Sequence, residues 1–407
     1  MILGVDYAPD VVGIAPYTTG LAEHLASAGM EVRVVTTFAH YPRYEWSGPA
    51  PLRGLVEERN GVTVDRRWVI LPRTDTVAWR ILFDMSFGVV ALAAVMLARC
   101  DVVISVCVPI QAGFVGGLVG RIRRLPSILL VQDLPVAAAT STGLLRSNGT
   151  AARIGRLVES LAMRLNQRVI VINERFAGYA RQSGVAPGSL QVVPNWVNDR
   201  VPHSAHGRSM FGLKDDLFLI VYAGNIGHKQ GLDVLPALSK LMSPNSQLLV
   251  IGDGSQKDRL EEACRQVGAS NITFTGLQSP ESLASALASA NVLFLSQSAR
   301  VVDSVVPSKL LTYMAAGKPV LAAVDANSVA AEIVKKAGCG IVVMPGSARD
   351  IADGFADLAA RPLEELGMLG ENARQYVADH HNRGSILARW VSLIGELAEL
   401  QRGGRSH

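Results

Sequence analysis

The sequence predicts an α/β protein with two doubly wound parallel sheets, and three observations predict this class. Short β-branched or apolar runs alternate with helical runs along the chain, which is typical of βαβ units. Eleven such runs are too many for one ordinary sheet. A polar segment at 195–216, containing Pro, Gly and two His, separates the two groups of runs. We therefore expect two Rossmann-like domains, one on each side of this segment.

The expected strands follow one another in chain order, five before the polar segment and six after it. They are Met1–Tyr7, Glu31–Thr37, Asp101–Val106, Ser127–Gln132, Arg168–Ile172, Phe218–Tyr222, Gln247–Gly252, Asn271–Thr275, Asn291–Leu295, Pro319–Ala323 and Gly340–Met344. A helix is expected from about Pro16 to Ala28. Apolar residues at helical spacing over 372–400 predict a long terminal helix.

Composition excludes several classes of protein. Four cysteines among 407 residues have no metal-ligand or CxxC spacing, so they indicate buried thiols in a reducing compartment. The chain begins directly with a strand and shows no signal peptide, so we expect a cytoplasmic protein. Residues 1–200 hold 20 Arg, no Lys and 15 Asp or Glu, a balance of +5, whereas the remainder carries −1. Basic and aromatic residues are not interleaved, so anionic lipid or a phosphorylated acceptor fits this half better than nucleic acid.

Residues Ile81–Ala98 form the most apolar stretch and allow two interpretations. The uninterrupted apolar run is shorter than the roughly 20 residues that a membrane span needs. A core helix of the first sheet is one interpretation. The other is an interfacial helix, because Trp79 and Arg80 begin it and Arg121, Arg123 and Arg124 follow downstream. This second interpretation predicts peripheral contact with an anionic membrane surface.

The most informative motif is VVPSKLLTYMAAGKPVLAAV, at Val305–Val324. Pro307 suits the first turn of a helix, Ser308 is a good cap, and the free N–H groups of that turn favour an anion. Lys309 adds a full positive charge at the same end. The motif therefore predicts a binding site for a diphosphate. An ordinary capped helix with a solvated lysine has the same pattern.

Glycine-rich loops follow several expected strands. Gly13, in the first loop, lets the backbone approach a ligand closely, but the loop lacks a GxGxxG fingerprint. The loop GNIGHKQGLD at 224–233 adds His228 and Lys229, which could bind phosphate oxygens or remain solvated. Two further loops lie where open α/β sheets bind ligands, VIGDGSQ at 250–256 and FTGLQSP at 274–280. We expect their residues to line the binding site for a base and a ribose.

Asp133 follows an expected strand in the first domain, within ILLVQDLP. A carboxylate at this position could act on an acceptor hydroxyl. It could equally cap the next helix.

Taken together, these motifs, with VVPNWVND before the linker and AGCGIVV near the end, resemble the family 4 glycosyltransferases of GT-B fold. The resemblance is strongest to the bacterial surface-polysaccharide branch, which includes fucosamine and colanic-acid transferases. It implies two Rossmann-like domains facing a cleft: an acceptor domain at 1–200 and a nucleotide-sugar domain at 201–378. A terminal helix at 379–407 is implied to pack back on the first domain.

The resemblance also implies anomeric retention, no catalytic metal, no cofactor, and roles for individual residues. Gly224, Lys229, Ser308 and Lys309 would reach the donor diphosphate, Gly13 would lie under it, and the Leu277 backbone would meet the uracil. The expected donor-binding set is Gly13, Gly224, Asn225, His228, Lys229, Gly252, Leu277, Pro307, Ser308, Lys309, Thr312 and Glu332. Asp133, Lys229 and Lys309 are the expected catalytic residues.

The sequence departs from the family pattern at two places. The family's Glu-x7-Glu pair is replaced by Ser304 and Thr312, so Thr312 or Glu332 is expected to contact the ribose. Asn225 and Gln230 replace the common Arg and Lys of the phosphate loop.

The expected function is a retaining transferase that moves an amino or deoxy hexose from a UDP donor to a lipid-linked or oligosaccharide acceptor. A sugar-nucleotide 2-epimerase of GT-B fold is one alternative, with Asp133 and Glu332 as its only candidate acid or base groups. A non-catalytic sugar-nucleotide-binding partner is the other alternative.

Overall fold

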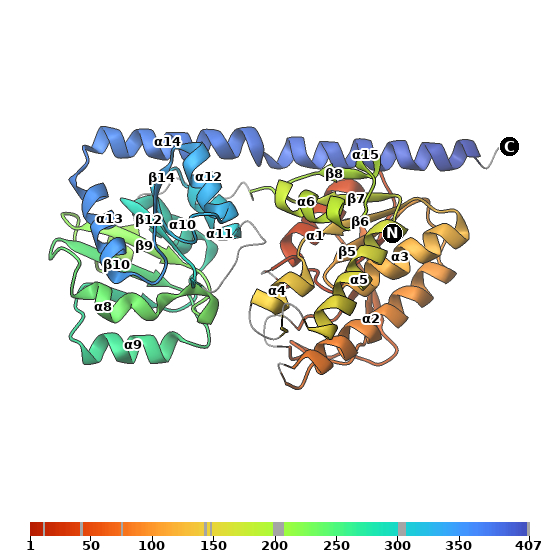
Figure 1. Ribbon diagram of the computed structural model, residues 1–407, viewed down its shortest axis with the longest axis horizontal. Helices are drawn as coiled ribbons and strands as arrows, with labels where there is room; N and C mark the ends of the chain where they lie inside the picture. Colours follow the sequence, from red (N-terminus) through yellow and green to blue (C-terminus); the bar gives the residue numbers. More distant parts are fainter. Residues whose placement is uncertain are drawn as a thin grey trace. The chain divides into compact units, whose positions relative to one another are not determined.

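The computed structural model describes residues 1–10, 13–40, 44–74, 76–141, 145–146, 149–197, 207–299 and 307–404. The chain forms two compact units (Figure 1). Unit 1 consists of Met1–Asn195 with Gly384–His407, and unit 2 of Trp196–Arg383. Each unit contains one mainly or wholly parallel sheet between layers of helices, so the predicted α/β class with two parallel-sheet domains is confirmed.

Unit 1 is built on a sheet of eight strands in the order β3-β4-β2-β1-β5-β6-β7-β8. Neighbouring strands are parallel except for the antiparallel pair β3–β4. The strands are β1 Ile2–Leu3, β2 Val32–Thr37, β3 Leu55–Arg59, β4 Val62–Arg67, β5 Val103–Cys107, β6 Ser127–Val131, β7 Arg168–Val171 and β8 Leu190–Val192.

Strands β3, β4 and β8 are absent from the sequence-based expectation. The hairpin β3–β4 turns at Asn60 and Gly61, whose φ angles are 48° and 78°. An Asn-Gly pair in this left-handed region is a strong hairpin signal, so the sequence contained the information needed to predict it. Strand β8 has only three residues, all half-buried, and offers no comparable pattern.

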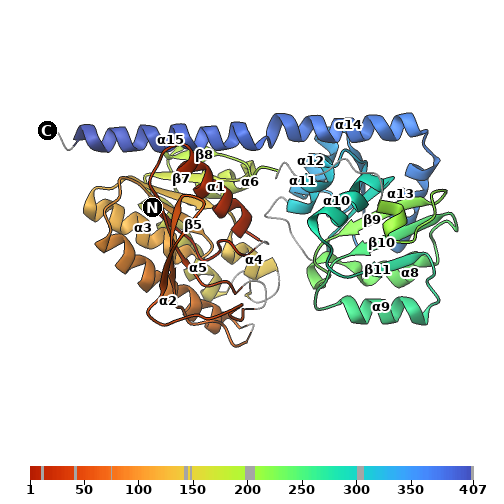
Figure 2. The same cartoon turned by 180° about the vertical axis from the view of Figure 1, so that it is seen from behind.

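The helices of unit 1 cover both faces of its sheet (Figures 1 and 2). They are α1 Ala15–Ser27, α2 Val77–Leu97, α3 Ile110–Arg123, α4 Pro135–Ser141, α5 Thr150–Leu165, α6 Glu174–Gln182, the short 3₁₀ helix η1 Pro187–Ser189, and α15 Arg383–Gly404. Helices α2 and α3 pack side by side, and their buried residues, such as Phe87 and Val115, share a core with Leu3 and Val103 of the sheet.

The terminal helix expected over 372–400 is divided into two. Helix α14, Leu363–His380, ends at His381, whose backbone leaves the helical region (φ −129°, ψ 21°). Helix α15 then begins at Arg383 and belongs to unit 1. The apolar residues that predicted this helix are buried: Ile386, Leu387, Trp390, Leu393, Ile394 and Leu397. The predicted return of the terminal helix to the N-terminal domain is therefore confirmed, but as a separate helix.

Unit 2 has a fully parallel sheet in the order β11-β10-β9-β12-β13-β14. Its strands are β9 Phe218–Ala223, β10 Ser246–Ile251, β11 Ile272–Thr275, β12 Val292–Ser296, β13 Val320–Ala323 and β14 Gly340–Val343. Its helices are α7 Gly207–Met210, η2 His228–Gln230, η3 Leu232–Val234, α8 Leu235–Ser239, α9 Lys257–Gln266, α10 Pro280–Ser289, α11 Ser308–Ala315, α12 Val329–Ala337, α13 Ala348–Ala360 and α14.

Successive strands of the unit 2 sheet are added first on one side of β9 and then on the other. Strands β10 and β11 extend to one side of β9, and β12, which follows them in the chain, pairs on its other side. Open parallel sheets bind ligands outside the carboxyl ends of their strands at such a switch point. Separate apolar clusters lie on the two faces of the sheet, with α8, α9 and α13 on one and α10, α11 and α12 on the other, and α14 contributes residues to both.

Candidate functional site

Lys309 is the central charged group at the switch point of unit 2. It lies in the first turn of α11, and its Nζ donates a 2.5 Å hydrogen bond to the Tyr222 hydroxyl at the end of β9. The same Nζ lies 4.4 Å from the centre of the Tyr222 ring. Burial lowers the pKa of the Lys309 ammonium to about 7. No described carboxylate forms an ion pair with it, so the ammonium is available to an anion.

Glycines allow three backbone segments to meet around this lysine. Gly224 follows β9 with φ 139°, and a Cβ there would lie 2.3 Å from Lys309 Cε. Gly252 follows β10 with φ 142°, and its Cβ would lie 2.0 Å from the carbonyl oxygen of Gly224. The strand ends and α11 are therefore packed more closely than any side chain at these two glycines would permit.

Two buried tyrosines, which sequence reasoning missed, hold the lysine in place. The Tyr313 hydroxyl accepts from the Ala223 N–H at 2.8 Å and donates to the Ala223 carbonyl at 3.0 Å, which fastens α11 to the end of β9. The Tyr222 hydroxyl donates to the Asn225 carbonyl at 2.6 Å, so its oxygen can accept from Lys309. Burial raises the pKa of both phenols, so both stay protonated at neutral pH.

The loop after β9 folds against the loop after β10. The Ile226 N–H donates to the Asp253 carbonyl, and the Gln256 N–H donates to the Ile226 carbonyl. The His228 ring meets the Gln256 amide, with 2.8 Å between Nε2 and Nε2. Among the predicted residues, the structure thus joins Gly224, Gly252 and Lys309 directly, and Asn225 and His228 through the surrounding loop.

The start of α11 differs in detail from the prediction. Pro307, rather than Ser308, occupies the cap position, and no side chain caps the helix. Ser308 is exposed in the first turn and accepts from Thr312 through its carbonyl oxygen at 3.1 Å. The predicted Ser308 cap is therefore wrong, but an uncapped first turn without an acidic residue still favours an anion.

Three other predicted donor residues lie at exposed positions of unit 2. Lys229 is exposed, and Leu277 is 79% exposed in the loop after β11. Glu332 forms a surface ion pair with Lys336 at 2.7 Å on α12. Ser304 lies outside the described residues. The predicted roles of Lys229, Leu277, Thr312 and Glu332 stay predictions.

Unit 1 places two further predicted residues at the carboxyl end of its own sheet. Asp133 follows β6, and its Oδ1 accepts from the N–H of Leu134, the residue before α4, at 2.7 Å. Gln132 forms two reciprocal amide hydrogen bonds with Asn195, at 3.0 and 2.8 Å. Gly13 has a φ of 67°, which requires the left-handed region that glycine tolerates.

The first prediction from this geometry concerns Gly224→Ala. The new Cβ would displace the Lys309 side chain, and alanine is strained at a φ of 139°. We expect UDP affinity to fall by about tenfold and the free energy of unfolding by about 1–2 kcal/mol. Isothermal titration and thermal unfolding measure the two effects. Gly268→Ala is the matched control, because its φ is also positive but a Cβ there meets nothing within 4 Å. Equal UDP affinity in the two variants would contradict the proposed packing around Lys309.

Two family descriptions match the chain, and they cover most of both units. Glycosyl transferases group 1 matches residues 208–376, and the glycosyl transferase 4-like domain matches residues 12–196. The chain is 26% identical to the putative colanic acid biosynthesis glycosyl transferase WcaI of Escherichia coli, over 97% of this chain and 99% of that protein. It is 25% identical to an uncharacterized glycosyltransferase of Methanocaldococcus jannaschii, over 95% of each.

Solved structures show the same fold. Sucrose-phosphate synthase from Thermosynechococcus elongatus superposes with a TM-score of 0.73 at 21% identity, over 97% of this chain and 98% of that one. WaaG, a glycosyltransferase involved in lipopolysaccharide biosynthesis, superposes with a TM-score of 0.69 at 17% identity, over 97% and 98%. HepE of Anabaena, in complex with UDP-glucose, superposes with a TM-score of 0.68 at 15% identity, over 97% and 99%.

Proposed function

This chain is a glycosyltransferase of family 4 with the GT-B fold, and we propose that it transfers a sugar from a UDP donor with retention of anomeric configuration. The transferred sugar is an amino or deoxy hexose. The acceptor is a lipid-diphosphate-linked sugar or an oligosaccharide in the synthesis of a surface polysaccharide. The names of WcaI and WaaG, and the UDP-glucose held by HepE, support this assignment.

The observation that carries the proposal is the buried Lys309 amine, which is charged in part at neutral pH and forms no ion pair with a described carboxylate. It lies in the uncapped first turn of α11, beside the glycine at the end of β9. A diphosphate leaving group gains negative charge as the glycosidic bond breaks. A positive charge and free N–H groups that are already in place stabilise this charge in the transition state.

A transfer assay tests this function. The full chain is incubated with individual UDP-sugars, with and without membranes or soluble oligosaccharides from a polysaccharide-producing bacterium, and UDP release is measured. Release that requires an acceptor, with retained configuration in the product, is expected. Interconversion of the donor without release would indicate the epimerase instead, and binding without turnover would indicate a non-catalytic partner.

The second prediction is that donor binding needs no metal ion. Lys309 and the first turn of α11 supply positive charge where other transferases use a divalent cation. We expect the affinity for UDP to be unchanged in excess EDTA. Isothermal titration with and without the chelator measures this, and a large loss of UDP affinity that Mg²⁺ or Mn²⁺ restores would overturn the prediction.

The outer face of α2 supports peripheral membrane contact. This helix of 21 residues is the one described helix that is long and apolar enough to cross a membrane by length and composition. Its inner face, including Phe83 and Phe87, packs in the core of unit 1. Its outer face is apolar and exposed at Ile81, Leu82, Met85, Val89, Leu92, Met96 and Leu97. The buried inner face is that of a core helix, and the exposed apolar outer face supports the proposed contact with a membrane surface.

The arginines expected beside this surface have a structural use. Arg121 donates to the carbonyls of Leu165 and Arg164, at 3.0 and 2.6 Å, and so caps the end of α5. Arg123 donates to the carbonyls of Val95 and Ala98 at the end of α2. Replacing these arginines would disturb two helix ends as well as removing charge, so the apolar residues offer the cleaner test.

The third prediction is that unit 1 binds anionic liposomes through the outer face of α2. Sedimentation with such liposomes should pellet the protein at low salt and less of it at high salt, because each basic side chain near the surface contributes about 1 kcal/mol and is screened. Met85→Gln/Val89→Gln/Leu92→Gln should stay soluble. The control Leu363→Gln/Met368→Gln replaces exposed apolar residues on α14. Equal pelleting of both variants would show that the outer face of α2 does not mediate binding to the liposomes.

A further inference from the structure

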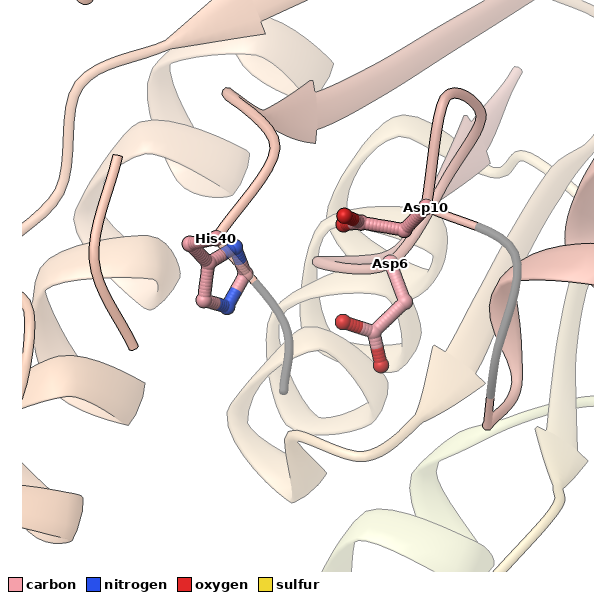
Figure 3. A group of neighbouring side chains, drawn as sticks. All are labelled: Asp6, Asp10 and His40. Carbon is pink, nitrogen blue, oxygen red and sulfur yellow. The ribbon is translucent and has the colours of Figure 1, made fainter. Parts of the chain in front are cut away.

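A cavity of about 460 Å³ lies on unit 1, at the edge of the sheet where its parallel strands begin. Its walls come from the segments that lead into β6 and β7, together with Gln401 of α15. The side chains of Figure 3, Asp6, Asp10 and His40, belong to the opposite edge, because they follow β1 and β2. Asp133 follows β6 and lies at that edge as well. The cavity is therefore separate from Asp133, the catalytic candidate of unit 1.

Two glycines of α3 explain how the walls of this cavity come together. A Cβ at Gly117 would lie 2.8 Å from Asn166 Nδ2, and one at Gly120 would lie 3.0 Å from the carbonyl oxygen of Leu125. The last turns of α3 therefore pack more closely against the end of α5 and the segment before β6 than larger residues would permit. Arg121 strengthens the same junction, because its Nε and Nη2 donate to carbonyl oxygens in the last turn of α5. The walls are thus held by contacts between neighbouring elements of unit 1.

Two of the lining residues, Asn166 and Gln401, each have a buried amide oxygen with no hydrogen-bond partner among the described residues. Asn166 is 5% exposed, and its Nδ2 donates to the carbonyls of Gly113 and Ala162 at 2.9 and 2.8 Å. Both carbonyls can only accept, so the orientation of the amide is fixed and Oδ1 is the atom without a partner. Gln401 is 8% exposed, and its Oε1 is the second such atom. Buried acceptors without partners are rare, so two around one cavity indicate a ligand that donates hydrogen bonds.

The same cavity carries positive charge. Arg121 and Arg124 line it, and none of its described lining residues is acidic. Arg124 follows α3 with a φ of 55° and is exposed. In the part of the chain that the structure describes, no salt bridge joins either guanidinium to a carboxylate, and the bonds from Arg121 to α5 leave its Nη1 unused. Two such guanidinium groups favour an anion, above all a phosphate, whose oxygens match the geometry of their N–H groups.

We propose that this cavity binds a phosphate ester that carries free hydroxyl groups. The phosphate meets Arg121 and Arg124, and the hydroxyl groups donate to the amide oxygens of Asn166 and Gln401. An inorganic anion satisfies only the arginines, and an uncharged polyol satisfies only the amides, so the two observations together specify the class of ligand. The proposal goes beyond the transfer reaction and does not depend on the donor site of unit 2.

A ligand of this class can be a soluble ester or the headgroup of a phospholipid, and the neighbouring surface favours the lipid. Leu118 and Ile122 of α3 and Leu161 of α5 are exposed within about one helical turn of lining residues. Helix α3 also packs against both α2 and α5. Acyl chains can lie on these apolar residues while the glycerophosphate of phosphatidylglycerol supplies the phosphate and the hydroxyl groups. The lipid source rests on the proposed contact of unit 1 with a membrane, whereas the soluble source does not.

Two pairs of probes test the proposal on the full chain. In the soluble pair, sn-glycerol 3-phosphate and methyl phosphate are titrated by calorimetry, and they differ in the free hydroxyl groups. In the lipid pair, vesicles of phosphatidylglycerol and of phosphatidylmethanol are compared by sedimentation, and they have the same charge and acyl chains. We expect the hydroxyl-bearing probe to bind about tenfold more tightly in at least one pair, because it alone meets the buried amide oxygens. A preference in the vesicle pair only identifies a lipid as the ligand, and a preference in the soluble pair only identifies a soluble ester.

Variants locate the binding to this cavity. Gln401→Met keeps an unbranched side chain of similar size but removes the buried oxygen, and Arg124→Gln removes one charge. Each should weaken binding of the preferred probe by about tenfold. Arg153→Gln, at an exposed arginine earlier on α5, and Gln266→Met, at an exposed glutamine on α9, are the matched controls for the soluble probes. The Tm of Gln401→Met should equal or exceed that of the parent, because an apolar group replaces a buried polar atom without a partner.

The outcomes of these measurements separate this proposal from the proposed function. Affinity for UDP should be the same in both cavity variants and the parent, since the donor site belongs to unit 2. A parent that prefers the hydroxyl-bearing probe in neither pair would overturn the proposal and leave water as the partner of the two amide oxygens. Parent-like binding in both Gln401→Met and Arg124→Gln would also overturn it. Binding of glycerol 3-phosphate by a parent that pellets with neither kind of vesicle would support the cavity and contradict the membrane contact of α2.

Discussion

Replacing Lys309 by alanine is expected to lower the affinity for UDP by about ten- to a hundredfold. A hydrogen bond to a charged group contributes about 1.5–3 kcal/mol, which corresponds to this range. The fold should survive, because the Tyr222 hydroxyl keeps its hydrogen bond to the Asn225 carbonyl and Tyr313 still fastens α11 to β9. Isothermal titration with UDP measures the change, and far-UV circular dichroism monitors the fold.

Two further variants make this prediction specific. Lys309→Met keeps an unbranched side chain of similar length without the charge, so it should bind UDP as weakly as Lys309→Ala if the charge is responsible. Lys240→Ala removes an exposed lysine after α8 and should bind like the parent. UDP affinity equal to the parent's in both Lys309 variants would show that the diphosphate lies elsewhere.

The part of the site that the sequence predicts is the part formed by backbone geometry. Glycines directly after strands, and a Pro-Ser-Lys before an apolar helix, are local patterns with a local cause. They predicted Gly224, Gly252 and Lys309, which the structure brings into contact. The cap at Ser308 failed because Pro307 takes that position, and a shift of one residue at a helix end is below what such patterns resolve.

The residues that position Lys309 could not be predicted in the same way. Tyr222 and Tyr313 occupy apolar positions of a strand and a helix, where an aromatic residue is expected simply to fill the core. Their hydroxyl groups become important only because β9 and α11 pack against each other.

The proximity of Asp6 to His40 could not be predicted for a related reason. Asp6 and His40 follow different strands, and only the parallel pairing of β1 with β2 brings them together. The α2 helix shows the opposite case: its apolar composition was visible, but the exposure of one face depends on the packing of α3 against the other.

The affinity for UDP is expected to fall as the pH rises above 7. In the free protein, burial lowers the pKa of the Lys309 ammonium to about 7. A bound diphosphate places negative oxygens beside this group and favours its charged form, so the pKa of Lys309 rises on binding. Below pH 7 the lysine is charged in both states, and pH has little effect through this group. Above pH 7 the free protein loses the proton and must regain it to bind.

The size of this effect follows from proton linkage. In the interval between the two pKa values, one proton is taken up for each UDP bound, so affinity falls by up to about tenfold per pH unit. Titrations at several pH values above neutrality, in buffers with different ionisation enthalpies, measure both the affinity and the proton uptake. Lys309→Arg is the matched control, because a guanidinium stays charged over this range and should give a flat profile. The prediction would be wrong if the UDP affinity of the parent did not change with pH and no proton were taken up on binding. Lys309 would then not gain a proton when the diphosphate binds.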